Sequence, residues 1–132
     1  MFASELPSMI ATLNSYESMF GPYHVQTLAL TVQLARALWS VGEAQAAQQL
    51  CERSARTLAR GRDEASFLRV SALTTLRDLF LEQGDSVKAI AVQKEVVESL
   101  TRLAGPGDPR VVNEKSDLAK MLLSENPRVV AA

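Results

Sequence analysis

The sequence predicts an all-α protein built as a solenoid of antiparallel helical hairpins, and three observations lead to this fold class. Apolar residues recur at helical spacing, as in Leu30, Leu34 and Leu38. Apolar and polar residues do not alternate convincingly at a period of two, so no strand is expected. Features of the turns and helices return every 42 residues, and a fixed period of roughly 20–50 residues is typical of stacked repeats.

The repeat is clearest in the turns. The segment GPYHVQT at residues 21–27 returns later in the chain as GPGDPRV at residues 105–111. Between them lie Gly42 and Gly84, each followed at once by an acidic residue and soon afterwards by an alanine. The middle copy of the Gly-Pro turn is replaced by DEASFLR at residues 63–69. The step from Gly42 to Gly84 is half the separation of the two Gly-Pro turns, so this step is the period of the repeat.

The first three helices are expected over residues 3–20, 24–41 and 43–60. The Gly-Pro turn ends the first helix. Gly42 ends the second, because glycine readily adopts the positive φ that closes a helix. The third helix begins directly after that glycine. The first two helices carry apolar faces at helical spacing, formed by Leu6, Met9, Ile10, Leu13, Tyr16 and Phe20, and by Leu30, Leu34, Leu38 and Val41.

The other three helices are expected over residues 64–83, 85–104 and 108–124. Gly84 separates the first two of these, and prolines mark the longer turn before the last one. A chain of 132 residues is expected to form one domain with its own core. This domain would consist of a half-hairpin over 3–20, repeats over 21–62 and 63–104, a half-repeat over 105–124 and a frayed tail over 125–132.

Composition and charge exclude several classes of protein. The formal net charge is −1, so nothing points to nucleic acid or to an anionic membrane surface as a partner. No apolar run is long enough to span a membrane, and the N-terminal residues do not form a secretory signal. The single cysteine, Cys51, excludes an intramolecular disulfide and favours a reducing compartment. The expected localisation is therefore cytoplasmic.

Few residues of the sequence could take part in catalysis or bind a metal. His24 has no catalytic partner motif around it and is expected to tie its turn to the next helix, and Cys51 is expected to be a small buried side chain. The two match no zinc-binding spacing. The sequence therefore predicts no enzyme, no catalytic residue, no metal and no cofactor. A stripe of arginines is interpreted as a solvated helix face, with a patch for an acidic partner or RNA as the alternative: Arg53, Arg56, Arg60 and Arg62.

Two long segments resemble a known family. The sequences GPYHVQTLALTVQLARALWSVGEAQAAQQLCERSARTL at residues 21–58 and LEQGDSVKAIAVQKEVVESL at residues 81–100 are similar to tetratricopeptide repeats. The 42-residue period and the Gly-Pro turn resemble the kinesin-light-chain type of this repeat, over roughly residues 5–124. The resemblance implies a right-handed superhelical α-solenoid of about six helices.

The resemblance also implies which residues pack between helices. In the first repeat these are Leu34, Ala35, Leu38, Ala47 and Ser54, in the second Leu76, Arg77, Phe80, Ala89 and Val96, and in the half-repeat Leu118, Ala119 and Leu122. Arg77 departs from the pattern, because that site is usually small. Either its aliphatic stem snorkels out of the interface or the hairpin is splayed there.

The function implied by the resemblance is a non-enzymatic protein–protein interaction scaffold. A peptide or helix of a partner protein would lie in a concave groove lined by the first helix of each repeat. The alternatives are a dedicated chaperone or assembly subunit that holds one client protein, and a regulatory or oligomerisation module of a larger system. The groove positions would be Val32, Gln33, Arg36, Trp39, Thr74, Thr75, Asp78, Leu81, Ser116, Asp117, Lys120 and Leu123.

These groove positions combine apolar and charged side chains. Trp39, Leu81 and Leu123 would form an apolar ladder along one edge, although Trp39 is also compatible with a place in the core. The charges would alternate along the groove in the order Arg36, Asp78 and Lys120. The apolar faces of the two terminal helices predict a homodimer that covers at least one of them, with a folded-back tail or a longer repeat array as alternatives.

Overall fold

The computed structural model describes residues 2–58 and 63–125, and these residues form six α-helices and no strand. The helices are α1 (Phe2–Phe20), α2 (Val25–Ser40), α3 (Ala44–Leu58), α4 (Asp63–Glu82), α5 (Ser86–Ala104) and α6 (Pro109–Glu125). The all-α prediction is confirmed, and each boundary that the structure describes lies within one residue of the expected one. Glu125 belongs to α6, and the rest of the predicted frayed tail lies outside the described residues, as does the expected end of the third helix.

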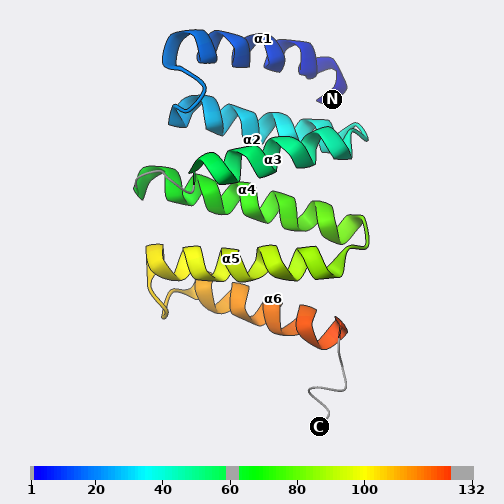
Figure 1. Ribbon diagram of the computed structural model, residues 1–132, viewed down its shortest axis with the longest axis vertical. Helices are drawn as coiled ribbons and strands as arrows, with labels where there is room; N and C mark the ends of the chain where they lie inside the picture. Colours follow the sequence, from blue (N-terminus) through cyan, green and yellow to red (C-terminus); the bar gives the residue numbers. More distant parts are fainter. Residues whose placement is uncertain (1, 59–62, 126–132) are drawn as a thin grey trace.

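The six helices are stacked in chain order. Each helix packs against the next, from α1 at one end of the stack to α6 at the other (Figure 1). One further contact joins α2 directly to α4. Consequently α2 and α4, which are separated in sequence by α3, share a surface.

Residue choices at the turns explain why the helices begin and end where they do. His24 caps α2: its Nδ1 accepts a hydrogen bond from the backbone N–H of Gln26 at 3.1 Å, and its ring stacks on Phe20. The structural role expected for this histidine is therefore confirmed. Asp85 caps α5 in the same way, because its carboxylate accepts from the backbone N–H of Lys88 at 3.2 Å.

Gly84 makes the turn between α4 and α5. Its φ is +78°, and the N–H of Asp85 donates to the carbonyl of Phe80 at 2.9 Å, which is the pairing that closes a helix through a left-handed residue. A side chain with a Cβ is strained in this conformation.

Gly84→Ala is therefore expected to lower the free energy of unfolding by about 1–2 kcal/mol. Gly107→Ala is the matched control, because Gly107 lies in a turn without a positive φ and its Cβ would meet no atom within 4 Å. Urea unfolding followed by circular dichroism measures both variants. Equal losses for the two alanines would contradict this account of the turn.

The core runs through the middle of the stack. Most residues implied as packing positions are buried there, including the small side chains Ala35, Ala47 and Ala89, which let neighbouring helices approach closely. The prediction is wrong for Ala119 and Leu122, which are exposed on α6. Among the described residues, no helix packs on that side of α6. The core is therefore built mainly by α2, α3, α4 and α5.

Candidate functional site

The candidate site is the surface that α2, α4 and α6 form together. Two of the residues expected on it do not reach it. Val32 and Thr75 are each only 3% exposed. Val32 is part of the core. Thr75 donates a hydrogen bond from its hydroxyl to the carbonyl of Ser71 and is covered by Arg36. Both are packing residues, so neither can present its side chain to a partner.

The other ten expected residues are accessible to different degrees. Trp39, Thr74 and Asp78 are half-buried. The remaining seven are exposed: Gln33, Arg36, Leu81, Ser116, Asp117, Lys120 and Leu123. Leu81 and Leu123 are 45% and 40% exposed, which is unusual for leucines in helices that also supply a core. These apolar side chains are available for contact on α4 and α6.

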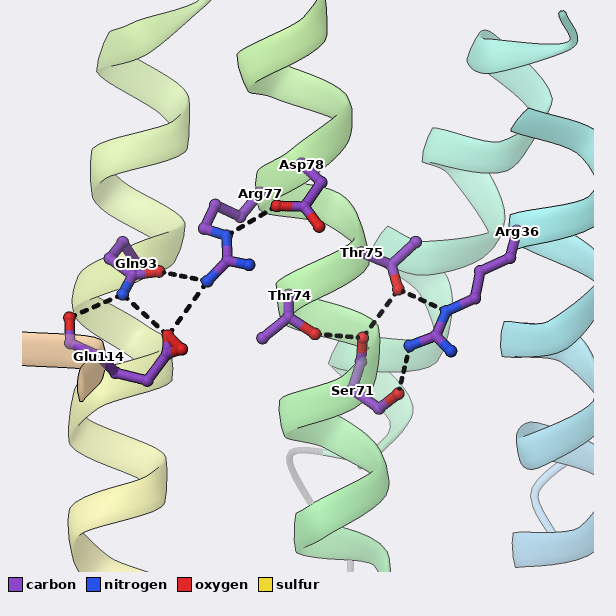
Figure 2. A network of polar contacts seen from close by, with 8 residues as sticks. All are labelled: Arg36, Ser71, Thr74, Thr75, Arg77, Asp78, Gln93 and Glu114. Carbon is purple, nitrogen blue, oxygen red and sulfur yellow. Dashed lines mark hydrogen bonds and ion pairs between the residues drawn. The ribbon is translucent and has the colours of Figure 1, made fainter. Parts of the chain in front are cut away.

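A hydrogen-bonded bridge joins α2 to α4 beneath this surface (Figure 2). The Nε of Arg36 donates to the hydroxyl of Thr75 at 3.1 Å, and one of its terminal nitrogens donates to the hydroxyl of Ser71 at 2.9 Å. Thr74 donates to the carbonyl of Ser71 at 3.0 Å. An arginine has five N–H donors, so these two bonds hold the guanidinium against α4 and leave donors for a ligand.

Trp39 links the same two helices about one turn further along α2, where it reaches the last residue of α4. Its ring packs against the core, while its indole N–H donates to the carboxylate of Glu82 on α4. A half-buried tryptophan with a bonded N–H combines a large apolar surface with a fixed orientation. Trp39 thus contributes to the core and also borders the surface, so both interpretations of this residue hold in part.

A polar network lies between α4, α5 and α6, and sequence reasoning missed it (Figure 2). The Arg77 guanidinium donates to the Gln93 side-chain oxygen at 2.9 Å, to the Glu114 carboxylate at 3.1 Å and to the Asp78 carboxylate at 3.0 Å. The amide nitrogen of Gln93, which is fully buried, donates to the Glu114 carboxylate and to the Glu114 backbone carbonyl, each at 2.9 Å. The polar groups of Arg77, Gln93 and Glu114 therefore pair with one another across the interface.

Both expectations for Arg77 are wrong. Its side chain is only 16% exposed, so it does not snorkel outward. The α4–α5 hairpin is closely packed, so it is not splayed. The arginine is accommodated in this interface because Gln93 and Glu114 supply acceptors for its guanidinium. One period before Arg77, Gln93 and Glu114 the chain carries Ala35, Cys51 and Ala72, which are fully buried at the equivalent interface.

This network also changes the charge pattern of the surface. The carboxylate of Asp78 is already paired with Arg77, so it offers less negative charge to a partner than the sequence pattern indicates. Lys120 makes no ion pair with any described residue and remains exposed. The accessible charges of the surface are therefore mixed: Arg36 and Lys120 are positive, and Asp117 is negative.

A hollow of about 210 Å³ opens between α4, α5 and α6. Leu81 and Lys120, which were expected on the partner-binding surface, both line it. Residues that were not expected complete it: Ser86, Ile90, Met121, Ser124 and Glu125. Met121 also packs against the core, so the hollow has an apolar floor, while charged side chains stand at its edge. The repeat pattern could not indicate these residues because they come from the beginning of α5 and the end of α6.

Cys51 is buried and unsuited to nucleophilic chemistry. Burial raises the pKa of its thiol to about 11, an effect to which Glu52 adds and which Arg36 partly offsets. At pH 8 the folded protein is therefore expected to alkylate roughly 100-fold more slowly than an exposed thiol, because the thiolate is the reactive species. Mass spectrometry after iodoacetamide treatment, with and without urea, measures this. Equal rates in the two conditions would contradict the burial of Cys51.

Metal-binding and membrane-spanning features were also sought. Within residues 2–58 and 63–125, no three histidine, cysteine, aspartate or glutamate side chains gather in a way that could hold a metal ion. None of the helices in this part of the chain has an apolar stretch sufficient to cross a bilayer. Arg53 and Arg56 of the arginine stripe are exposed, and Arg60 and Arg62 lie outside the described residues.

The terminal helices expose apolar side chains, as the homodimer prediction requires. On α1 these are Ile10, Met19 and Phe20, and on α6 they are Val112, Leu122 and Leu123. The dimer itself stays a prediction.

Comparison with known proteins adds no assignment. The chain has no match among protein-family models, and a search of curated proteins finds none either.

Proposed function

We propose that this protein is a non-enzymatic interaction scaffold that holds a peptide or helix of a partner protein across α2, α4 and α6. In this proposal the stack is a tetratricopeptide-like, right-handed superhelical solenoid. One observation carries the proposal: Leu81 and Lys120, on different helices, line the same hollow of about 210 Å³. A hollow of this kind can take one apolar side chain of a partner and pair a neighbouring carboxylate with the lysine.

Further support comes from the accessible side chains of α2, α4 and α6. Leu81 and Leu123 present accessible apolar surface, whose burial by a partner is favourable. Gln33, Thr74 and Ser116 offer amide and hydroxyl groups on α2, α4 and α6. Such groups can satisfy the backbone of a bound peptide, which would otherwise lose its hydrogen bonds to water.

A double variant tests the proposal directly. Leu81→Asp combined with Lys120→Glu places two negative charges on the hollow, so binding of the partner is expected to weaken at least about tenfold. The matched control is Val87→Asp combined with Lys94→Glu on α5, where both side chains are exposed. The tagged protein first retains its partner from the native lysate. Calorimetry then gives the affinity of the purified partner for each variant.

The control must bind like the unchanged protein. Equal affinity of the Leu81/Lys120 variant and the unchanged protein would contradict a binding surface on α2, α4 and α6. Circular dichroism of each variant verifies that the helices are intact.

A further inference from the structure

A second cavity lies between α1, α2 and α3, away from the surface proposed to bind the partner. It has a volume of about 330 Å³, and its polar lining includes Glu17, Thr31, Arg53, Ser54 and Thr57. On α2, Leu28 lines this cavity, whereas Gln33 belongs to the partner surface. Five residues turn an α-helix by about 140° beyond one full turn, so these two side chains point to different sides of α2.

Ser54 is the unusual residue of this cavity. It is only 1% exposed, and its hydroxyl has no hydrogen-bond partner, which sets it apart from the other buried side-chain polar atoms that the structure describes. A buried hydroxyl without a partner is unfavourable, because it has lost its hydrogen bonds to water. Ser54 also lines the cavity, so a ligand there can supply the missing bond. The repeat equivalent of Ser54 is Val96, which has no polar group to satisfy.

The next repeat shows what occupies the corresponding place. There Arg69 of α4 reaches between α3 and α5 and donates to the Ser99 hydroxyl at 2.7 Å, to the Glu95 carboxylate at 3.1 Å and to the Ala55 carbonyl at 3.3 Å. In the second repeat the Arg69 guanidinium therefore occupies the place between α3 and α5, and the Glu95 carboxylate of α5 pairs with it.

In the first repeat the same positions are changed in a consistent way. One period earlier in the chain, the positions of Arg69, Glu95 and Ser99 hold Thr27, Arg53 and Thr57. The first repeat therefore has the short Thr27 in place of the long arginine, Arg53 in place of the glutamate, and the hydroxyl of Thr57 in place of the serine hydroxyl. Arg53 makes no ion pair with any described residue. The position that holds the negatively charged Glu95 in the second repeat therefore holds the positively charged Arg53 in the first.

We propose that this cavity binds a carboxylate carried on a short apolar stem. The Arg53 guanidinium pairs with the carboxylate and the Ser54 hydroxyl donates to it, while Leu28 and Pro22 contact the stem. Glu17 also lines the cavity and repels a second negative charge, so a monocarboxylate is preferred to phosphate. The carboxylate has two sources with the same chemistry: a free short-chain acid, or an acidic side chain of a bound peptide.

The test is an NMR titration of the full chain at pH 7 with 4-methylpentanoate, 4-methylpentanamide and inorganic phosphate. Backbone amide shifts near Glu17, Leu28 and Ser54 are expected with the acid, and not with the uncharged amide or with phosphate. Arg53→Gln is expected to weaken binding of the acid about tenfold, because it removes the charged donor. Arg56→Gln is the matched control, since Arg56 is exposed on the same helix and does not line the cavity.

Two peptides distinguish the sources. One is acetyl-Ala-Glu-Ala-amide, and the other has glutamine in place of the glutamate. If the glutamate peptide binds at least tenfold tighter than the free acid and the glutamine peptide causes no shifts, the site is assigned to an acidic side chain. If the free acid binds at least tenfold tighter than the glutamate peptide, the site is assigned to a free acid. Ser54→Ala keeps the fold and weakens whichever ligand binds several-fold. Equal shifts with acid and amide, no shifts with any probe up to about 50 mM, or full binding by Arg53→Gln would each overturn the proposal. The hollow proposed to take the partner lies between α4, α5 and α6, so that proposal stands or fails separately.

Discussion

Glu114→Ala will lower the free energy of unfolding by about 3 kcal/mol, the lower end of the range for breaking a buried ion pair. The substitution removes the carboxylate that accepts from both Arg77 and Gln93. The Arg77 guanidinium, whose side chain is 16% exposed, then loses its counterion on α6 and keeps an ion pair only with the more exposed Asp78 carboxylate. Urea unfolding followed by circular dichroism measures the loss.

A triple variant separates the network from the volume of its side chains. Arg77→Met, Gln93→Leu and Glu114→Met replace all three members by apolar residues of similar size. The carboxylate that loses its ion pair with Arg77, that of Asp78, is 45% exposed and can be hydrated. Replacing a whole buried ion pair in this way is often neutral or stabilising. The equivalent interface already accepts an apolar set, namely Ala35, Cys51 and Ala72. The triple variant should unfold within about 1 kcal/mol of the unchanged protein, and a loss as large as that of Glu114→Ala would contradict this account.

Leu79→Ala will also cost about 3 kcal/mol, within the range for truncating a buried leucine. Leu79 is fully buried in the core, with no exposed area. Leu81 stands two residues later on α4 and is 45% exposed, so Leu81→Ala should change stability by less than about 1 kcal/mol. The same denaturation experiment measures both.

The comparison of these two leucines also bears on function. In the proposed scaffold, Leu81→Ala weakens the partner while leaving the fold intact. Loss of stability in Leu81→Ala equal to that in Leu79→Ala would show that Leu81 belongs to the core. It would then be unsuitable as a binding residue.

Helix boundaries could be predicted from the sequence because the turns have strong local chemistry. Gly42 and Gly84 both adopt positive φ and end α2 and α4, and their spacing along the chain defined the repeat. Small buried side chains such as Ala47 and Ala89 could be placed for a similar reason, since close helix contact admits little else.

The fine orientation of side chains could not be predicted to the same accuracy. Neighbouring residues on a helix are about 100° apart, so a small error in rotation moves a residue from the surface into the core. Val32 and Thr75 were misplaced in this way. The Arg77 network joins residues 37 positions apart on α4 and α6, which no local pattern displays. The signal that could have found it is the joint departure of Arg77, Gln93 and Glu114 from the small residues one repeat earlier.

The most direct test of the scaffold proposal is photo-crosslinking within the complex. A benzophenone amino acid is placed at position 81, beside the hollow, and in a separate sample at position 87, which is 69% exposed on α5. The account predicts that the partner crosslinks from position 81 and not from position 87. Crosslinking from position 87 alone, with the complex intact in both samples, would contradict it.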